Sequence, residues 1–171
     1  MEDIVRQSLR RGSALLCSLA LLAFTAVPAL AGEYAALTGV KGLDSVFDVS
    51  VSSAAKAVVT FPAIRGVYLD QEVRGLPAAP RTVIVFHGGA VKLVSTETTG
   101  VDKADQESLD KVVAMIRQFK KDGVKLEVCM YAVKALDIDP ATILPEVDKV
   151  GNGFISVLGY QAQGYSLVSI P

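Results

Sequence analysis

The sequence has no tryptophan, a single histidine and only two cysteines among its 171 residues. Aromatic side chains make up 6% of the chain, and the formal net charge is only -1. Because there is no basic surplus and no block of one charge, the composition argues against nucleic acid as a partner. Apolar residues make up 51% of the chain, which argues against a disordered protein. We therefore expect one compact domain of ordinary size.

Several motifs that carry well-defined chemistry are also missing. The sequence contains no GxGxxG, no GxxxxGKS/T, no CxxC and no HExxH. Dinucleotide-binding, P-loop, thioredoxin-type and zincin functions therefore lack their signatures. One histidine and two cysteines do not supply a closed zinc site within a single chain. We expect neither a metal nor an organic cofactor.

The first 31 residues have the build of a secretory signal peptide. Arginines at positions 6, 10 and 11 precede an apolar run over residues 14–24, which leads to the small-residue motif ALA at 29–31. This arrangement predicts cleavage after Ala31. An uncleaved anchor is the alternative, but the run is shorter than the roughly 20 residues of a membrane-spanning helix. We expect a periplasmic or secreted protein with no membrane attachment after cleavage.

Removal of this segment would leave Cys129 as the one cysteine of the chain. A disulfide framework needs pairs of cysteines, so this thiol is either buried and inert, paired between chains, or reactive. Residues 32–45 show no clear periodicity and are expected to form a loosely held arm. The domain itself is expected over residues 46–171.

Hydrophobic periodicity after the arm predicts strands that alternate with helices. The expected strands cover residues 46–52, 81–87, 124–130, 145–150 and 165–170. One expected helix follows a cap at Ser52 or Ser53. A second follows a cap at Asp102 or Asp105 and ends near Gly123. Two more cover residues 131–136 and 154–163. Alternation of this kind predicts an α/β domain with a largely parallel sheet of about five strands.

Two loops at the carboxyl ends of predicted strands carry candidate functional side chains, and open parallel sheets bind ligands outside these ends. His87, Gly88 and Gly89 leave the second strand, and Cys129 leaves the third. A cysteine there faces the amino end of the next helix, whose N–H groups and dipole stabilise a thiolate. Lys134, about one helical turn on, would add positive charge. A structural, hydrogen-bonded His87 and a simple glycine turn are the alternatives.

From Val46 to its end, the chain resembles the DsrE/DsrF-like family of small sulfur-relay proteins. The resemblance rests on landmarks that occur in a fixed order: VIVFHG at 83–88, GVKLEVC at 123–129, GNGFIS at 151–156 and GYQAQGY at 159–165. It implies a three-layer α/β/α sandwich that assembles as a homo-oligomer, a trimer or a hexamer. The best-known relay members work in the cytoplasm with partner subunits, so the resemblance does not identify this chain's sulfur donor or acceptor thiols.

The resemblance also implies roles for individual residues. Cys129 corresponds to the sulfur acceptor of the better-known members, and His87 is a candidate for shuttling a proton or orienting the thiolate. Gly88, Gly89, Lys134 and Asn152 are the candidate binding residues.

The leading hypothesis is a periplasmic protein that carries sulfane sulfur as a persulfide on Cys129. A noncatalytic oligomeric module with a small-ligand pocket near His87 and Asn152, and a thiol redox sensor, are the two alternatives.

Overall fold

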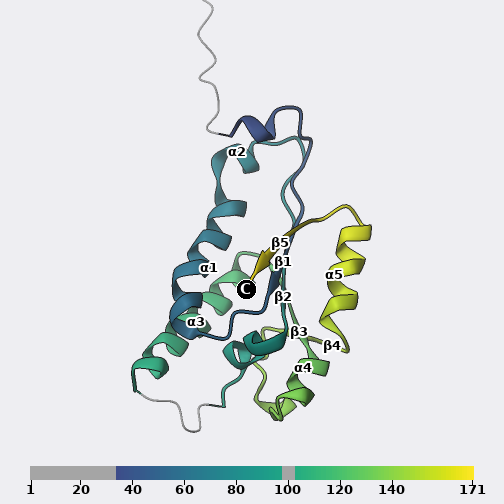
Figure 1. The fold of residues 1–171 in the computed structure, drawn as a ribbon. Helices are drawn as coiled ribbons and strands as arrows, with labels where there is room; N and C mark the ends of the chain where they lie inside the picture. The colour runs from purple at the N-terminus through teal and green to yellow at the C-terminus, as the bar shows by residue number, and fades with distance from the viewer. Residues whose placement is uncertain (1–33, 98–102) are drawn as a thin grey trace, which may run out of the picture. The chain divides into compact units, whose positions relative to one another are not determined.

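The computed structural model describes residues 34–97 and 103–171. Five strands form one parallel sheet in the order β4-β3-β2-β1-β5 (Figure 1). The strands are β1 (Ser45–Val49), β2 (Thr82–Phe86), β3 (Lys125–Cys129), β4 (Asp148–Val150) and β5 (Ser166–Ile170). The predicted α/β fold with a parallel sheet of about five strands is confirmed. The predicted signal peptide and the cap at Asp102 lie outside the described residues.

Helices cover both faces of this sheet. In Figure 1, α1 (Ala54–Leu69) and α3 (Lys103–Lys121) lie on one face and α5 (Gly153–Ala162) lies on the other, which gives three layers. The shorter elements are the helices α2 (Gln71–Arg74) and α4 (Met130–Ala135) and the 3-10 helices η1 (Ala35–Leu37), η2 (Gly88–Val94) and η3 (Pro140–Thr142). Within residues 34–97 and 103–171, no helix has both the length and the apolar character needed to cross a membrane.

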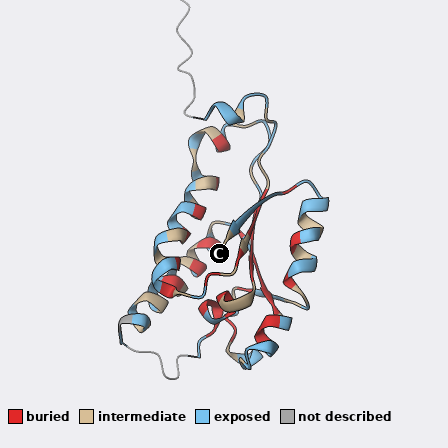
Figure 2. Ribbon diagram, viewed as in Figure 1, coloured by how far each residue is buried: buried red, intermediate tan, exposed pale blue. Residues whose placement is uncertain are grey.

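The main hydrophobic core lies between the sheet and the pair α1 and α3, and Figure 2 shows buried residues concentrated along the inner strands β1, β2 and β3. The ring of Phe61 on α1 packs against Phe86 of β2 and Phe119 of α3 at centroid distances of 6.1 and 5.7 Å. Ser53 caps α1 by accepting a hydrogen bond from the backbone N–H of Lys56. This packing holds α1 helical through Pro62, although proline removes one helical hydrogen bond.

Both faces of β1 are covered. Strand β1 pairs with both β2 and β5 and therefore lies inside the sheet. A second, smaller core under α5 includes Val46, Val85 and Val157. Asp48 follows Val46 on this covered side of β1, so it is not the solvated residue that a half-buried strand would carry.

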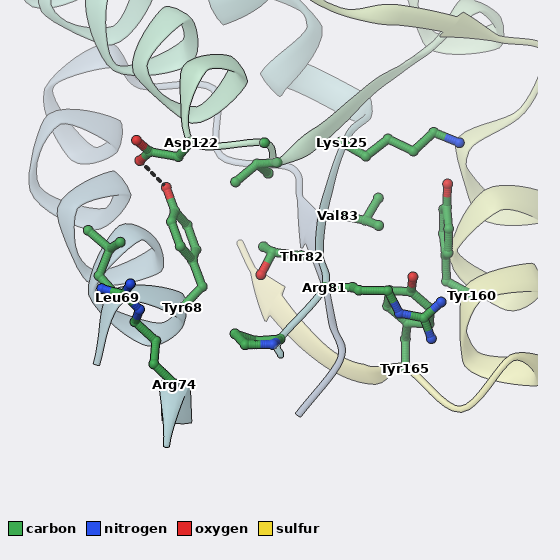
Figure 3. A pocket seen from close by; sticks show the side chains of 13 residues that line it. Tyr68, Leu69, Arg74, Arg81, Thr82, Val83, Asp122, Lys125, Tyr160 and Tyr165 are labelled. Carbon is green, nitrogen blue, oxygen red and sulfur yellow. Dashed lines mark hydrogen bonds between the residues drawn. The ribbon is translucent and has the colours of Figure 1, made fainter. Parts of the chain in front are cut away.

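Asp122, just after α3, ties this helix to α1. Its carboxylate accepts hydrogen bonds from Arg65 (2.7 and 3.3 Å), from the Tyr68 hydroxyl (2.7 Å, Figure 3) and from Gln118 (2.7 Å). The hydrogen bonds from Arg65, followed by those from Tyr68 and Gln118, hold the pKa of Asp122 well below its usual range. The cluster therefore stabilises the folded state most strongly when Asp122 is ionised.

Replacing Asp122 with asparagine is expected to lower the free energy of unfolding at pH 7 by about 2 kcal/mol, because charged hydrogen bonds are lost. A carboxyl whose pKa is lower in the folded state stabilises that state above its unfolded pKa of about 4 and loses this contribution as the pH falls further. Urea unfolding should therefore show a smaller difference between wild type and variant at pH 3. The control is Asp110→Asn at an exposed position of α3. An equal difference at both pH values would contradict an ionic role for Asp122.

Candidate functional site

Cys129 and His87 lie side by side at the carboxyl edge of the sheet. Phe86 and Val128 are partners in the parallel pairing of β2 with β3, and His87 and Cys129 are the next residues of the two chains. The position of Gly153 also shows that they are close. A β-carbon added to Gly153 would lie 3.0 Å from Cβ of Cys129 and 3.5 Å from Cβ of His87. The sheet thus brings together the one histidine of the chain and the cysteine of β3.

Both residues line a cavity of about 350 Å³. Only 4% of Cys129 is exposed, and this residue forms part of the cavity wall. Much of the wall is apolar or aromatic, and the ring of Phe154 packs edge-on against His87 at a centroid distance of 5.1 Å. The lining consists of Ser52, His87, Gly88, Gly89, Lys92, Cys129, Tyr131, Ala132, Ala135, Leu136 and Phe154.

A carboxylate holds the histidine from the other side. Oδ1 of Asp48 on β1 lies 2.6 Å from Nε2 of His87, and both atoms are shielded from solvent. Neither atom has an aligned hydrogen-bond partner among the described residues, so the contact is a close approach of the two groups and not a directed hydrogen bond. Because Nε2 faces Asp48, Nδ1 is the other ring nitrogen and is not engaged by this carboxylate.

The two glycines after His87 let the loop pass close to the end of β1. Gly88 has a φ of +51°, in the left-handed region that favours glycine. A β-carbon on Gly89 would lie 2.5 Å from Cβ of Ser52, a distance that side chains do not reach. Gly88 and Gly89 both line the cavity, and their backbone shapes its wall.

A polar cluster fixes α5 over the sheet and so fixes the position of Gly153 and Phe154. Tyr160 on α5 donates a 2.7 Å hydrogen bond to the buried Glu127 of β3, and Lys125 Nζ lies 3.0 Å from the same oxygen. Burial of Glu127 opposes its ionisation. Hydrogen bonds from neighbours that include Tyr160 and Lys125 outweigh burial and hold the pKa of Glu127 below its usual value. The negative charge of Glu127 on the sheet face under α5 is therefore compensated by Lys125 and Tyr160.

The other predicted binding residues do not line the cavity of Cys129. Lys134 is exposed on α4. Asn152 caps α5 by accepting a 3.0 Å hydrogen bond from the backbone N–H of Phe154, and so acts on the site through the helix that it starts. Helix α4 has only six residues, and Cys129 is its N-cap residue without a side-chain cap hydrogen bond. Dipole stabilisation of a thiolate by such a short helix is correspondingly small.

A larger cavity, of about 660 Å³, lies at the opposite, amino edge of the sheet (Figure 3). Its lining includes the cations Arg74, Arg81 and Lys125, and the last two are paired with carboxylates. Lys125 pairs with Glu127, and Arg81 pairs with Asp44 and packs over the Tyr165 ring at 5.1 Å from its centroid. This cavity contains neither Cys129 nor His87. We therefore assign the candidate site to the smaller cavity.

Sequence reasoning missed Asp48, Ser52, Lys92 and Phe154 as parts of this site. Asp48 could have been found from the sequence, because it is a charged residue inside an otherwise apolar strand. No pattern in the sequence pointed to Ser52 or Lys92, because only the folded sheet shows which segments adjoin Cys129.

The fold and the site together define a small three-layer α/β protein with a thiol and a histidine at the carboxyl edge of its sheet. The model of the DsrE/DsrF-like family matches residues 46–170. The chain belongs to this family, and membership indicates a sulfur-relay role.

Among solved structures, the chain is similar to a protein of unknown function, MTH1491, from Methanobacterium thermoautotrophicum. The two share 16% sequence identity and a TM-score of 0.58, over 74% of this chain and 98% of the other. This likeness supports the fold alone. A search of curated proteins finds no match.

Proposed function

We propose that this protein carries sulfane sulfur as a persulfide on Cys129 in the periplasm. The observation that supports the proposal most is the cavity shared by Cys129 and His87 in a chain of a sulfur-relay family. A carrier needs a thiol that is protected from bulk oxidants but open to a donor. A buried thiol at the wall of a cavity meets both requirements.

The chemistry needs no metal, cofactor or external oxidant. The Cys129 thiolate attacks the sulfane sulfur of a donor, R–S–SH, and a new S–S bond forms on Cys129 as the donor's S–S bond breaks. The donor leaves as the thiolate R–S⁻, and the transferred sulfur keeps its proton. An acceptor thiolate then takes the outer sulfur and returns Cys129 as a thiolate. His87, held by Asp48, accepts the proton of the Cys129 thiol before the attack.

Export is the second part of the proposal, and it is supported by the sequence of residues 1–31. One experiment addresses both parts. The full chain is expressed in a bacterium, recovered from the periplasm and weighed by intact-mass spectrometry before and after exposure to a sulfane donor. We expect the mass of residues 32–171, with a gain of about 32 Da for one sulfur atom that a reductant removes. A protein that never gains sulfur while ligands still bind its cavity would be the noncatalytic module instead.

We also propose that the protein assembles as a homo-oligomer, a trimer or a hexamer. Helix α5 carries Phe154, Ile155 and Leu158, each more than half exposed. Tyr131, a lining residue of the Cys129 cavity, is 71% exposed. Large apolar side chains gathered in this way mark an interaction surface more often than a free surface. If copies of the chain contact one another through these side chains of α5, the interface lies next to the Cys129 cavity.

Replacing Leu158 with glutamate is expected to shift the oligomer to monomers, because several copies of an unpaired charge would be buried together. Native mass spectrometry measures the change. Val59→Glu is the matched control, since Val59 is an equally apolar and 77% exposed residue on α1. Dissociation by the α1 variant, with the α5 variant unaffected, would place the interface elsewhere and contradict the proposed surface.

A further inference from the structure

Lys92 stands between the Cys129 cavity and a second cavity of about 510 Å³. Lys92, Ser52 and Leu136 line both, so the two spaces adjoin at the carboxyl edge of the sheet. A molecule held in the second cavity would therefore lie next to the space that Cys129 faces. The second cavity is large enough to hold the non-reacting part of a donor while the donor's sulfane sulfur reaches Cys129.

The charges around the second cavity differ from those around the thiol. Lys92 is the one lysine or arginine in the lining of either cavity, and it forms no ion pair with the described residues. None of the described residues that line the Cys129 cavity carries a carboxylate. The described residues that line the second cavity include Glu97, Asp105 and Asp137, together with the hydroxyl residues Ser52, Ser53 and Ser95. A cation at the junction and carboxylates beyond it suit a ligand that carries both signs of charge.

We infer that the sulfur donor is a small persulfide of the amino-acid type, with one carboxylate and one ammonium group. Its carboxylate pairs with Lys92, its ammonium lies toward the carboxylates of the second cavity, and its sulfane sulfur points to Cys129. This inference rests on the proposed function and adds the donor's chemical class to it. The transfer leaves the donor as the corresponding thiol, so atoms and electrons balance as in the general reaction.

The test uses two donors with the same amine and persulfide groups, cysteine persulfide, which carries a carboxylate, and cysteamine persulfide, which lacks it. The full chain carrying Cys17→Ser, which leaves Cys129 as its one thiol, is compared with the same chain carrying Lys92→Gln. The ratio of the loading rate with cysteine persulfide to that with cysteamine persulfide is expected to fall about fivefold in the variant, the effect of one partly exposed ion pair. Lys121→Gln, an exposed lysine at the far end of α3, is the matched control.

Alkylation separates donor selection from persulfide chemistry. Iodoacetate carries a carboxylate and iodoacetamide does not, and both react with a thiol. The Lys92→Gln variant is expected to lose preference for iodoacetate by a similar factor. If neither persulfide loads wild type although iodoacetamide reaches Cys129, the proposed function fails and the donor inference fails with it. If both persulfides load and the ratio is the same in wild type and Lys92→Gln, the inference about the donor is overturned and the carrier function stands.

Discussion

Replacing Cys129 with serine is expected to abolish sulfur loading completely. Serine has nearly the same shape as cysteine, but its hydroxyl is neither ionised nor strongly nucleophilic near neutral pH and forms no S–S bond. Exposure to a sulfane donor should add about 32 Da to the chain with Cys17→Ser and nothing to the chain with both substitutions. Loading that persists in the double variant would exclude Cys129 as the carrier.

Loss of folding must be separated from loss of chemistry, because Cys129 is buried and packs with the main core. A serine hydroxyl left without a partner there costs about 1–3 kcal/mol. Cys129→Ala avoids this polar group and serves as the second variant. Far-UV circular dichroism and urea unfolding should show both variants folded at 25 °C, and both should fail to take up sulfur.

Replacing His87 with alanine is expected to slow sulfur loading about 100-fold, within the range that a positioned proton-transfer group contributes. The cavity enlarged by this change should accept imidazole, and added imidazole should restore part of the rate. A purely structural histidine would not give rescue of this kind. Single-turnover loading followed by mass spectrometry measures the rates, and Asp48→Asn should reduce the rate by a smaller factor because the ring remains.

Two results would contradict this role for His87. An unchanged loading rate in His87→Ala would show that the thiol ionises without help from the imidazole. A slow rate that imidazole does not raise, together with a lowered unfolding midpoint, would show that His87 acts only through packing against Phe154 and Asp48.

Much of the fold could be predicted from local patterns. The continuous apolar run at 83–86 identifies a strand covered on both faces, and the structure has β2 there with all five residues buried. The apolar stripe of α3 and the left-handed Gly123 after it identify a helix and its end. Such signals depend on residues near one another in the chain, which is why they are readable. Strand β4 begins at Asp148, three residues later than its pattern suggested.

The site depends on long-range packing and was less accessible to prediction. The element order predicted that His87 and Cys129 each follow the end of a strand. That these strands are neighbours, and that the two residues adjoin, required the pairing and register of β2 with β3. The contact of Asp48 with His87 required β1 to lie inside the sheet with α5 above it. Lys134 was predicted as a binding residue because it is close to Cys129 in the sequence, whereas Lys92 borders the cavity from η2, 37 residues before Cys129.

The most direct test of the account is a chase of labelled sulfur through Cys129. The full chain carrying Cys17→Ser is loaded from a donor whose sulfane sulfur is isotopically labelled, freed of excess donor, and mixed with a thiol acceptor. We predict that the label leaves Cys129 as the acceptor gains it, and that the thiol can then be loaded again. A label that stays on Cys129, or that never reaches it, would contradict a sulfur carrier.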